Sequence, residues 1–287
     1  MKTERICAVF FSPTQGTKRY VEGIAGRLGD HYEVIDLTRP ENREKEYFFE
    51  ETDLVILGAP VYAGRLPDVK GGIFDRLHGS RTPAVFTVSY GNRDYDDALL
   101  EEQRLCEANG FVGIAAAAWI APHTFSAKIA AGRPDEADEK QLDLFAERLK
   151  AILSGEASGC RLTVKGNEPY RDGMKMPFHP SADDSCTGCK TCVSACPTGA
   201  IDPARPRETD AEKCIDCLAC AKACPSHSRR ILDPMFEGMV KKLEAGIKGT
   251  RRELEFFFVR KSNFSFLSEK RIKGDRVLSM SSMLIDS

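Results

Sequence analysis

Eight of the eleven cysteines in this 287-residue chain lie in two runs of identical spacing. Each run reads C-x2-C-x2-C-x3-C-P, and the second begins 28 residues after the first. The two runs are Cys186, Cys189, Cys192 and Cys196, and Cys214, Cys217, Cys220 and Cys224. Iron in sulfide clusters takes thiolate ligands, and this spacing lets one short loop wrap three corners of a cube. The pattern therefore predicts two [4Fe–4S] clusters.

The fourth cysteine of each run is expected to bind the cluster of the other run. We predict that cluster I is held by Cys186, Cys189, Cys192 and Cys224, and cluster II by Cys214, Cys217, Cys220 and Cys196. Structural zinc is the alternative, but zinc sites use two C-x2-C pairs to close one tetrahedron. Doubled runs of four cysteines, each followed by proline, do not fit that pattern. Two other cysteines, Cys7 and Cys106, are predicted to be small buried hydrophobic residues, and no role is assigned to Cys160.

The net charge and the lengths of the apolar runs argue against a nucleic-acid partner, a membrane span and a secretory signal. A net charge of −2 argues against a nucleic-acid partner, which requires a strongly basic surface. No apolar run reaches the roughly 18 residues of a membrane span. The opening MKTERICAVFF holds too short an apolar run for a secretory signal. We therefore expect a cytoplasmic protein without a membrane span, in which clustered cysteines bind metal.

Short apolar runs alternate with helical patterns in the first half of the chain. Strands are predicted at residues 6–11, 32–37, 53–60, 84–90 and 111–121, and helices at 17–28, 69–77, 96–108 and 136–153. Apolar strands that alternate with helices indicate a parallel sheet covered on both faces. The predicted fold class is α/β, a flavodoxin-like doubly wound five-stranded parallel sheet followed by a small α+β two-cluster ferredoxin domain. Ligands of such sheets bind beyond the carboxyl ends of the strands.

Three loops at those carboxyl ends carry suitable residues for a ligand. After the first strand, Ser12, Thr14 and Thr17 offer hydroxyls and Gly16 lets backbone amides approach an anion at the start of a helix. A plain helix cap is the alternative interpretation. Tyr62 and Tyr90, in the next two loops, each stand beside small residues. An aromatic face beside closely approaching backbone suits a planar ring.

With these loops the chain resembles the flavodoxin–ferredoxin fusion proteins of anaerobic bacteria. The shared stretches are F-S-P-T-x-x-T-K, P-V-Y-A-G-R-x-P, Y-G-N-R-x-Y-x-D-A-L and PHTFSAKIAAGRPDEAD, at residues 11–18, 60–67, 90–99 and 122–138. The resemblance implies FMN, with its phosphate at residues 12–17 and its ring between the two tyrosine loops. The implied binding residues are Ser12, Thr14, Gln15, Gly16, Thr17, Pro60, Val61, Tyr62, Ala63, Gly64, Ser89, Tyr90, Gly91, Asn92 and Tyr95. Ordinary flavodoxins read T-G-N-T at residues 14–17, so the glycine here is displaced by one.

Several single residues keep two interpretations. Trp119 is expected in the core rather than against the flavin, and His123 in a solvent or capping role rather than at the flavin edge. Arg65 and Arg93 flank the expected ring site, either as cations near the flavin or as solvated side chains. Arg229 and Arg230 follow the second cysteine run, and their positive charge is expected to raise the potential of a nearby cluster.

The expected organisation is a flavodoxin-like domain at 1–154, a linker or packed extended segment at 155–182, the ferredoxin domain at 183–233, and a helix and tail at 234–287. The last twenty or so residues are expected to be poorly structured. The predicted function is electron transfer between the clusters and FMN, with an unidentified redox protein as partner. The alternatives are a flavin-dependent reductase of a quinone or nitro compound and a redox-sensing binding protein.

Overall fold

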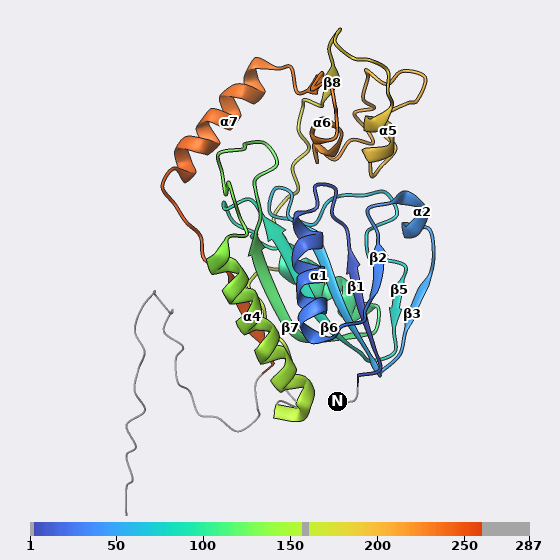
Figure 1. Ribbon diagram of the computed structural model, residues 1–287, viewed down its shortest axis with the longest axis vertical. Helices are drawn as coiled ribbons and strands as arrows, with labels where there is room; N and C mark the ends of the chain where they lie inside the picture. The colour runs from blue at the N-terminus through green and yellow to red at the C-terminus, as the bar shows by residue number, and fades with distance from the viewer. Residues whose placement is uncertain (1–2, 157–160, 260–287) are drawn as a thin grey trace, which may run out of the picture.

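A mainly parallel sheet forms the body of the molecule, and the cysteine-rich segment lies above its upper edge (Figure 1). The computed structural model describes residues 3–156 and 161–259. The five predicted strands are all present, as β1 (Arg5–Phe10), β2 (Glu33–Asp36), β4 (Asp53–Pro60), β6 (Thr82–Tyr90) and β7 (Phe111–Ile120). All five are parallel, and they lie in the order β7-β6-β4-β1-β2. Counted along the chain this is 5-4-3-1-2, the flavodoxin-like order, so the predicted fold is confirmed.

Helices cover this sheet because its central strands are apolar on both faces. Every residue of β6 is buried, and so is every residue of β4 except Pro60. Helices α1 (Gly16–Leu28) and α4 (Glu136–Ala151) lie side by side in front of the sheet in Figure 1, while α3 (Ala98–Ala108) packs on β6 and β7. A short π-helical turn, Ile152–Glu156, follows α4. The core side chains Cys7, Cys106 and Trp119 are fully buried, as predicted.

The segment predicted as a helix at residues 69–77 is not helical, so that prediction was wrong. Gly71 and Gly72 both take left-handed backbone angles, with φ of 82° and 73°, which turn the chain instead of continuing a helix. The segment ends in β5 (Leu77–Gly79), which pairs with β3 (Tyr47–Phe49) in a separate two-stranded sheet. A single short helix, α2 (Pro40–Arg43), precedes β3.

The cysteine-rich segment has little regular structure. Strand β8 (Ser181–Ala182) pairs antiparallel with β9 (Arg229–Arg230), and between them lie the short helices α5 (Thr191–Ala195) and α6 (Ala219–Lys222). Residues 161–182 follow the body as a packed extended segment: the carboxylate of Asp97 accepts hydrogen bonds from the backbone N–H groups of Asn167 (2.9 Å) and Arg171 (2.7 Å). None of the described helices has the length and apolar character that crossing a bilayer requires.

A sixth strand comes from the segment expected to be a tail. After α7 (Pro234–Ile247), strand β10 (Glu255–Phe258) pairs antiparallel with β7 at the edge of the main sheet. Its three phenylalanines pack against the core of the sheet, and Phe256 contacts the ring of Trp119. The apolar run was visible in the sequence, but its pairing partner lies more than 130 residues earlier in the chain. Residues 260–287, expected to be poorly structured, and Cys160 lie outside the described residues.

Two side chains beyond β6 hold the chain that leads into β10. The Asn92 amide donates to the carbonyl oxygen of Thr250 (2.7 Å) and accepts from the N–H of Arg252 (3.0 Å). The Tyr95 hydroxyl donates to the Glu255 carboxylate (2.7 Å). Asn92 and Tyr95 are therefore anchors for the returning chain.

Replacing Asn92 with alanine should loosen β10, because each lost hydrogen bond to buried backbone costs about 1 kcal/mol or more. Hydrogen exchange of the amides of Phe256–Phe258 is expected to accelerate roughly fivefold or more. The internal control is β2 at the opposite edge of the sheet, whose exchange should not change. Equal acceleration at both edges would instead indicate general destabilisation.

Candidate functional site

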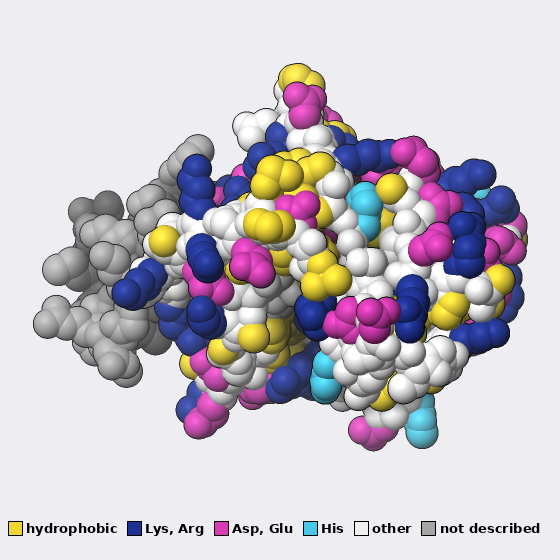
Figure 2. All heavy atoms as spheres, turned by 90° about the horizontal axis from the view of Figure 1, so that it is seen from above, with side chains coloured by type: hydrophobic (Ala, Val, Ile, Leu, Met, Phe, Trp, Pro, Cys, Tyr) yellow, Lys and Arg dark blue, Asp and Glu magenta, His cyan; other side chains and the backbone are white. Residues whose placement is uncertain are grey.

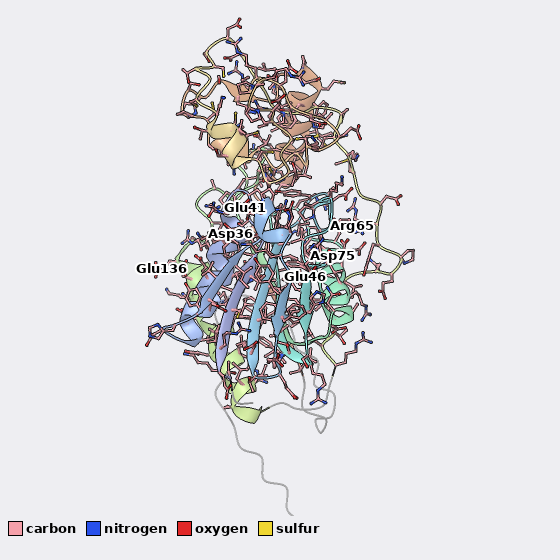
Figure 3. All side chains as sticks on the ribbon, turned by 90° about the vertical axis from the view of Figure 1, so that its right-hand side faces the viewer. Asp36, Glu41, Glu46, Arg65, Asp75 and Glu136 are labelled. Carbon is pink, nitrogen blue, oxygen red and sulfur yellow. The ribbon has the colours of Figure 1, made fainter. Side chains whose placement is uncertain are left out.

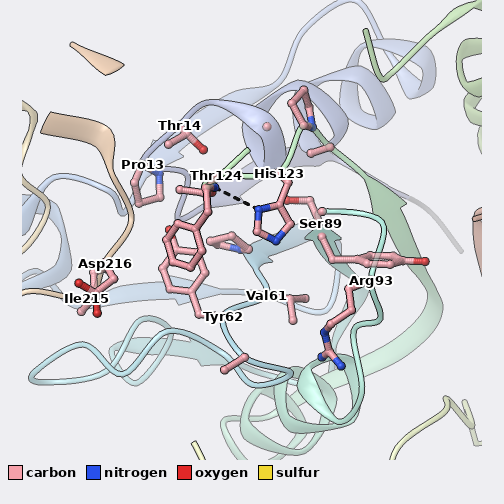
Figure 4. Close-up of a pocket in the computed structure, with 18 of the residues that line it drawn as sticks. Pro13, Thr14, Val61, Tyr62, Ser89, Arg93, His123, Thr124, Ile215 and Asp216 are labelled. Carbon is pink, nitrogen blue, oxygen red and sulfur yellow. Dashed lines mark hydrogen bonds between the residues drawn. The ribbon is translucent and has the colours of Figure 1, made fainter. Parts of the chain in front are cut away.

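A cavity of about 330 Å³ opens at the carboxyl ends of β1, β4 and β6, where the sequence predicted a ligand. This size is within the range of small-molecule sites. Eleven of the fifteen predicted binding residues line it: Ser12, Thr14, Gly16, Thr17, Pro60, Val61, Tyr62, Ala63, Ser89, Tyr90 and Gly91. The other four, Gln15, Gly64, Asn92 and Tyr95, are not among its lining residues. The three loops thus converge on one space, as Figure 4 shows for Thr14, Tyr62 and Ser89.

The loop after β1 is folded around the start of α1. The Ser12 hydroxyl accepts from the N–H of Lys18 (3.0 Å), and the hydroxyls of Thr17 and Ser89 lie 2.7 Å apart. Gly16 and Thr17, the first residues of α1, line the cavity. The first N–H groups of a helix have no partner within the helix and carry partial positive charge, so this end of the cavity suits an anion.

The displaced glycine has a structural reason. Gln15, not Gly16, takes the left-handed conformation at the start of α1, with a φ of 67°. Gly16 instead packs closely on Ala121, since a Cβ at residue 16 would lie 3.0 Å from the Ala121 Cβ. The loop therefore accepts a non-glycine residue in an unfavourable backbone region and keeps its glycine for the close contact with Ala121, which follows β7.

Besides the eleven predicted residues, thirteen others line the cavity, and all of these except Pro13 and Arg93 lie outside the three predicted loops. The loop after β7 contributes residues 121–125, the extended segment contributes Met174 and Met176, and α7 contributes Met239 and Leu243. Ile215 and Asp216, which lie between two cysteines of cluster II, complete the wall. Figure 4 shows both residues beside Tyr62. Residues 122–125 belong to the shared stretch at 122–138, but no motif marks Met174, Met176, Met239 or Leu243 as cavity residues, since their segments are far from the three loops in the sequence.

His123 combines the two roles left open by the sequence, since it lines this cavity and also caps a backbone N–H group. Its Nδ1 accepts from the N–H of Phe125 (3.0 Å; dashed line in Figure 4), so Nε2 carries the proton of the neutral ring. Burial, with smaller contributions from Lys222 and Arg93, lowers the pKa of His123 from 6.5 to about 4. Gly91 packs on the ring, and a Cβ at residue 91 would lie 2.4 Å from His123 Cδ2.

The two arginines expected near the ring have different places. Arg65 lies at the edge of the sheet that faces the cysteine-rich segment (Figure 3), where it binds the Glu101 carboxylate through two hydrogen bonds of 2.7 and 2.8 Å and stacks over Tyr170. It does not line the cavity. Arg93 does, and its guanidinium pairs with Asp96. Of the two arginines, Arg93 is thus the one that lines the cavity.

The eight cysteines of the two runs gather in the cysteine-rich segment. Cys186, Cys189, Cys192 and Cys224 surround one small cavity, which is the set predicted for cluster I. The other predicted set also lies together: burial raises the pKa of the Cys217 thiol, and Cys220, Cys196 and Cys214 are near enough to add to this effect. The fourth cysteine of the first run, Cys196, caps the end of α5, and Cys224 follows α6. The short helices therefore precede the fourth cysteines.

Polar donors around these sulfur atoms fit metal-bound thiolates. The N–H of Ala200 donates to Cys196 Sγ at 3.2 Å, and the hydroxyls of Ser228 and Ser226 lie 3.4 and 3.6 Å from Cys224 Sγ. The Ser228 contact lowers the pKa of the Cys224 thiol to about 6, which favours the thiolate that a metal requires. Soft sulfur ligands supported in this way suit iron–sulfur clusters.

Three residues of different types that can bind a metal also lie close together in this segment. His179, Cys214 and Asp216 bring ligand atoms within 4.8 Å of one another. The His179 ring binds Asp216 (Nδ1 to Oδ1, 2.8 Å), and Cys214 belongs to the second cysteine run. These residues therefore adjoin the predicted cluster II.

Comparison with known proteins decides the nature of the cysteine-rich segment. Residues 185–228 match the family described as a 4Fe-4S dicluster domain. The chain joins a flavodoxin-like fold to a 4Fe-4S dicluster domain. The match favours iron–sulfur over zinc at the cysteine runs. No curated protein matches the chain.

Solved structures similar to the chain include two flavodoxins. The flavodoxin of Streptococcus pneumoniae TIGR4 is 19% identical, with a TM-score of 0.38, over 52% of this chain and 99% of that one. A flavodoxin from the domain Archaea is 10% identical, with a TM-score of 0.34, over 53% and 99%. The fold assignment rests on the strand order given above.

The low pKa of His123 has a measurable consequence. A histidine that stays neutral in the fold stabilises it above pH 6.5, and this contribution is lost as the pH falls toward 4. Between pH 7.5 and 5.5, wild type should lose about 1.4 kcal/mol of unfolding free energy relative to His123→Gln. Chemical denaturation at both pH values measures this, with His31→Gln as the control at an exposed site. Parallel pH curves for wild type and His123→Gln would contradict the burial of a neutral ring.

Proposed function

We propose that this protein is an electron-transfer iron–sulfur flavoprotein that passes electrons between two [4Fe–4S] clusters and FMN. The observation that carries the proposal is the shared cavity wall: Ile215 and Asp216 line the cavity formed by the three flavin-type loops, and Cys214 and Cys217 flank them. When bound, the flavin takes up one or two electrons whereas each cluster takes one, so the pair can combine single electrons or split a pair.

The protein's own residues supply binding and orientation in this proposal. The start of α1 and the hydroxyls of Ser12, Thr14 and Thr17 would hold the phosphate. Tyr62 would offer the ring a stacking face, Arg93 a positive charge, and His123 a neutral Nε2–H donor. The methionines and leucine of the outer wall would exclude water from the ring.

Cluster II would be the cluster next to the flavin. Tyr62 is half-buried against it, and burial raises the pKa of the Tyr62 hydroxyl well above its usual range, with smaller contributions from Cys217, Asp216 and Cys214. Tyr62, Met174, Ile215 and Asp216 also line a second cavity, of about 650 Å³, together with Cys214. One layer of side chains therefore separates a ligand of cluster II from the ring site.

Cluster I would face outward. Cys189 is the one exposed cysteine of the eight, and the neighbouring residues 187, 188 and 190 are exposed too. Figure 2, which views the molecule from the side of this segment, shows basic and acidic side chains interspersed over that face. We propose that a redox partner protein exchanges electrons here.

A carrier is favoured over a reductase of small molecules by the cavity itself. At about 330 Å³ it is near the lower limit of small-molecule sites, and residues of α7, the extended segment and the 214–217 loop line its outer side. A bound ring would leave little space for a second substrate above it.

The test is FMN binding by anaerobically prepared protein with intact clusters, measured by flavin fluorescence. Wild type should bind one FMN per chain. Gly91→Ala should weaken binding at least tenfold, because the added methyl group displaces His123 into the cavity. Gly173→Ala, whose Cβ would meet no atom within 4 Å, is the matched control. Absence of FMN binding by wild type, or equal affinity in both variants, would contradict the proposed site.

A further inference from the structure

A buried arginine lies between the two sets of cluster cysteines. Arg229 is 2% exposed. Its guanidinium donates to the carbonyl oxygens of Pro206 (2.7 Å), Glu208 (3.0 Å) and Pro180 (3.1 Å), and to the hydroxyl of Thr209. These partners are all uncharged. Within residues 3–156 and 161–259, no carboxylate pairs with Arg229, and its Nε has no nitrogen or oxygen partner.

Cysteines predicted to bind both clusters lie near Arg229. Arg229 lines the small cavity that Cys186, Cys189, Cys192 and Cys224 surround. The Pro206 carbonyl, which accepts from Arg229, also lies 3.7 Å from Cys192 Sγ. Cys220, predicted for cluster II, lies in α6, and this helix packs against β9, the strand that carries Arg229.

An unpaired buried charge is costly, so a buried arginine needs a nearby negative charge. The cluster thiolates are the candidates that the described residues offer. Reduction adds one negative charge to a cluster, and a fixed cation in a weakly polar interior stabilises that added charge. Net charge and hydrogen bonds to sulfur are two of the factors that set cluster potentials.

We propose that Arg229 is the shared counterion of the two clusters and raises both of their reduction potentials. The inference rests on the two-cluster part of the proposed function and does not depend on FMN. From the sequence, Arg229 and Arg230 had the same expected role, whereas in the structure only Arg229 faces the predicted cluster ligands.

The neighbouring arginine provides the matched control. Arg230 follows Arg229 in β9, and successive strand residues point to opposite faces. Its side chain is 56% exposed and pairs with Asp183 at 2.9 Å. Arg230 thus has the same charge and nearly the same sequence position, but a carboxylate partner and contact with solvent.

The experiment is an EPR-monitored redox titration of the full chain with reconstituted clusters, for wild type, Arg229→Gln, Arg229→Lys and Arg230→Gln. In Arg229→Gln the ratio of reduced to oxidised cluster at a fixed potential should fall about tenfold, a downward shift of about 59 mV for a one-electron couple. Arg229→Lys keeps the charge and should shift far less, and Arg230→Gln should match wild type.

The iron content of each variant separates the outcomes. Equal potentials in wild type and an iron-replete Arg229→Gln would overturn the inference, as would an equal shift in Arg230→Gln. If Arg229→Gln fails to assemble clusters, the lysine variant decides: assembly with potentials near those of wild type supports a role of charge. Loss of assembly in both would show that Arg229 acts through its hydrogen bonds to the loops, which also overturns the inference. Wild-type protein without two clusters would refute the proposed function itself.

Discussion

The seating of one loop, residues 214–217, against the carboxyl edge of the sheet is the contact on which the rest of the site depends. Ile215 and Asp216 line the cavity beside Tyr62, while the cysteines on either side of them are predicted cluster ligands. The ring site and the iron–sulfur segment therefore share a wall. In the proposed function, movement of this loop would change both the shape of the cavity and the distance over which electrons pass.

The segments that hold the loop in place return to the sheet from both sides. Residues 161–176 are fixed by Asp97 and place Met174 and Met176 over the cavity. Helix α7 adds Met239 and Leu243, and β10 then joins the edge of the main sheet. The carboxylate of Glu244 on α7 accepts from Ser126 (2.7 Å) and Lys128 (2.9 Å), beyond β7. The iron–sulfur segment is thus tied to the body before and after its cysteines.

Local patterns predicted most of the fold and the inner half of the site. Continuous apolar runs fixed the five parallel strands, and the loops at their ends converged as expected because parallel strands end at one edge. The helix expected at residues 69–77 failed because Gly71 and Gly72 turn the chain. Strand β10 and the outer wall of the cavity depend on contacts between distant segments, for which local sequence carries no periodic signal. His123 directly follows β7, and the structure gives it both the cavity-facing position and the capping contact between which the sequence did not decide.

The central claim is that the cavity and cluster II form one electron path. Stopped-flow mixing of cluster-reduced protein with one equivalent of oxidised FMN, in the absence of any other reductant, tests it most directly. The account predicts that bleaching of the flavin band and reoxidation of the clusters proceed together, with equal numbers of electrons lost and gained. The account would be contradicted if bound flavin stayed oxidised and the clusters stayed reduced in a protein whose flavin potential lies above the cluster potentials.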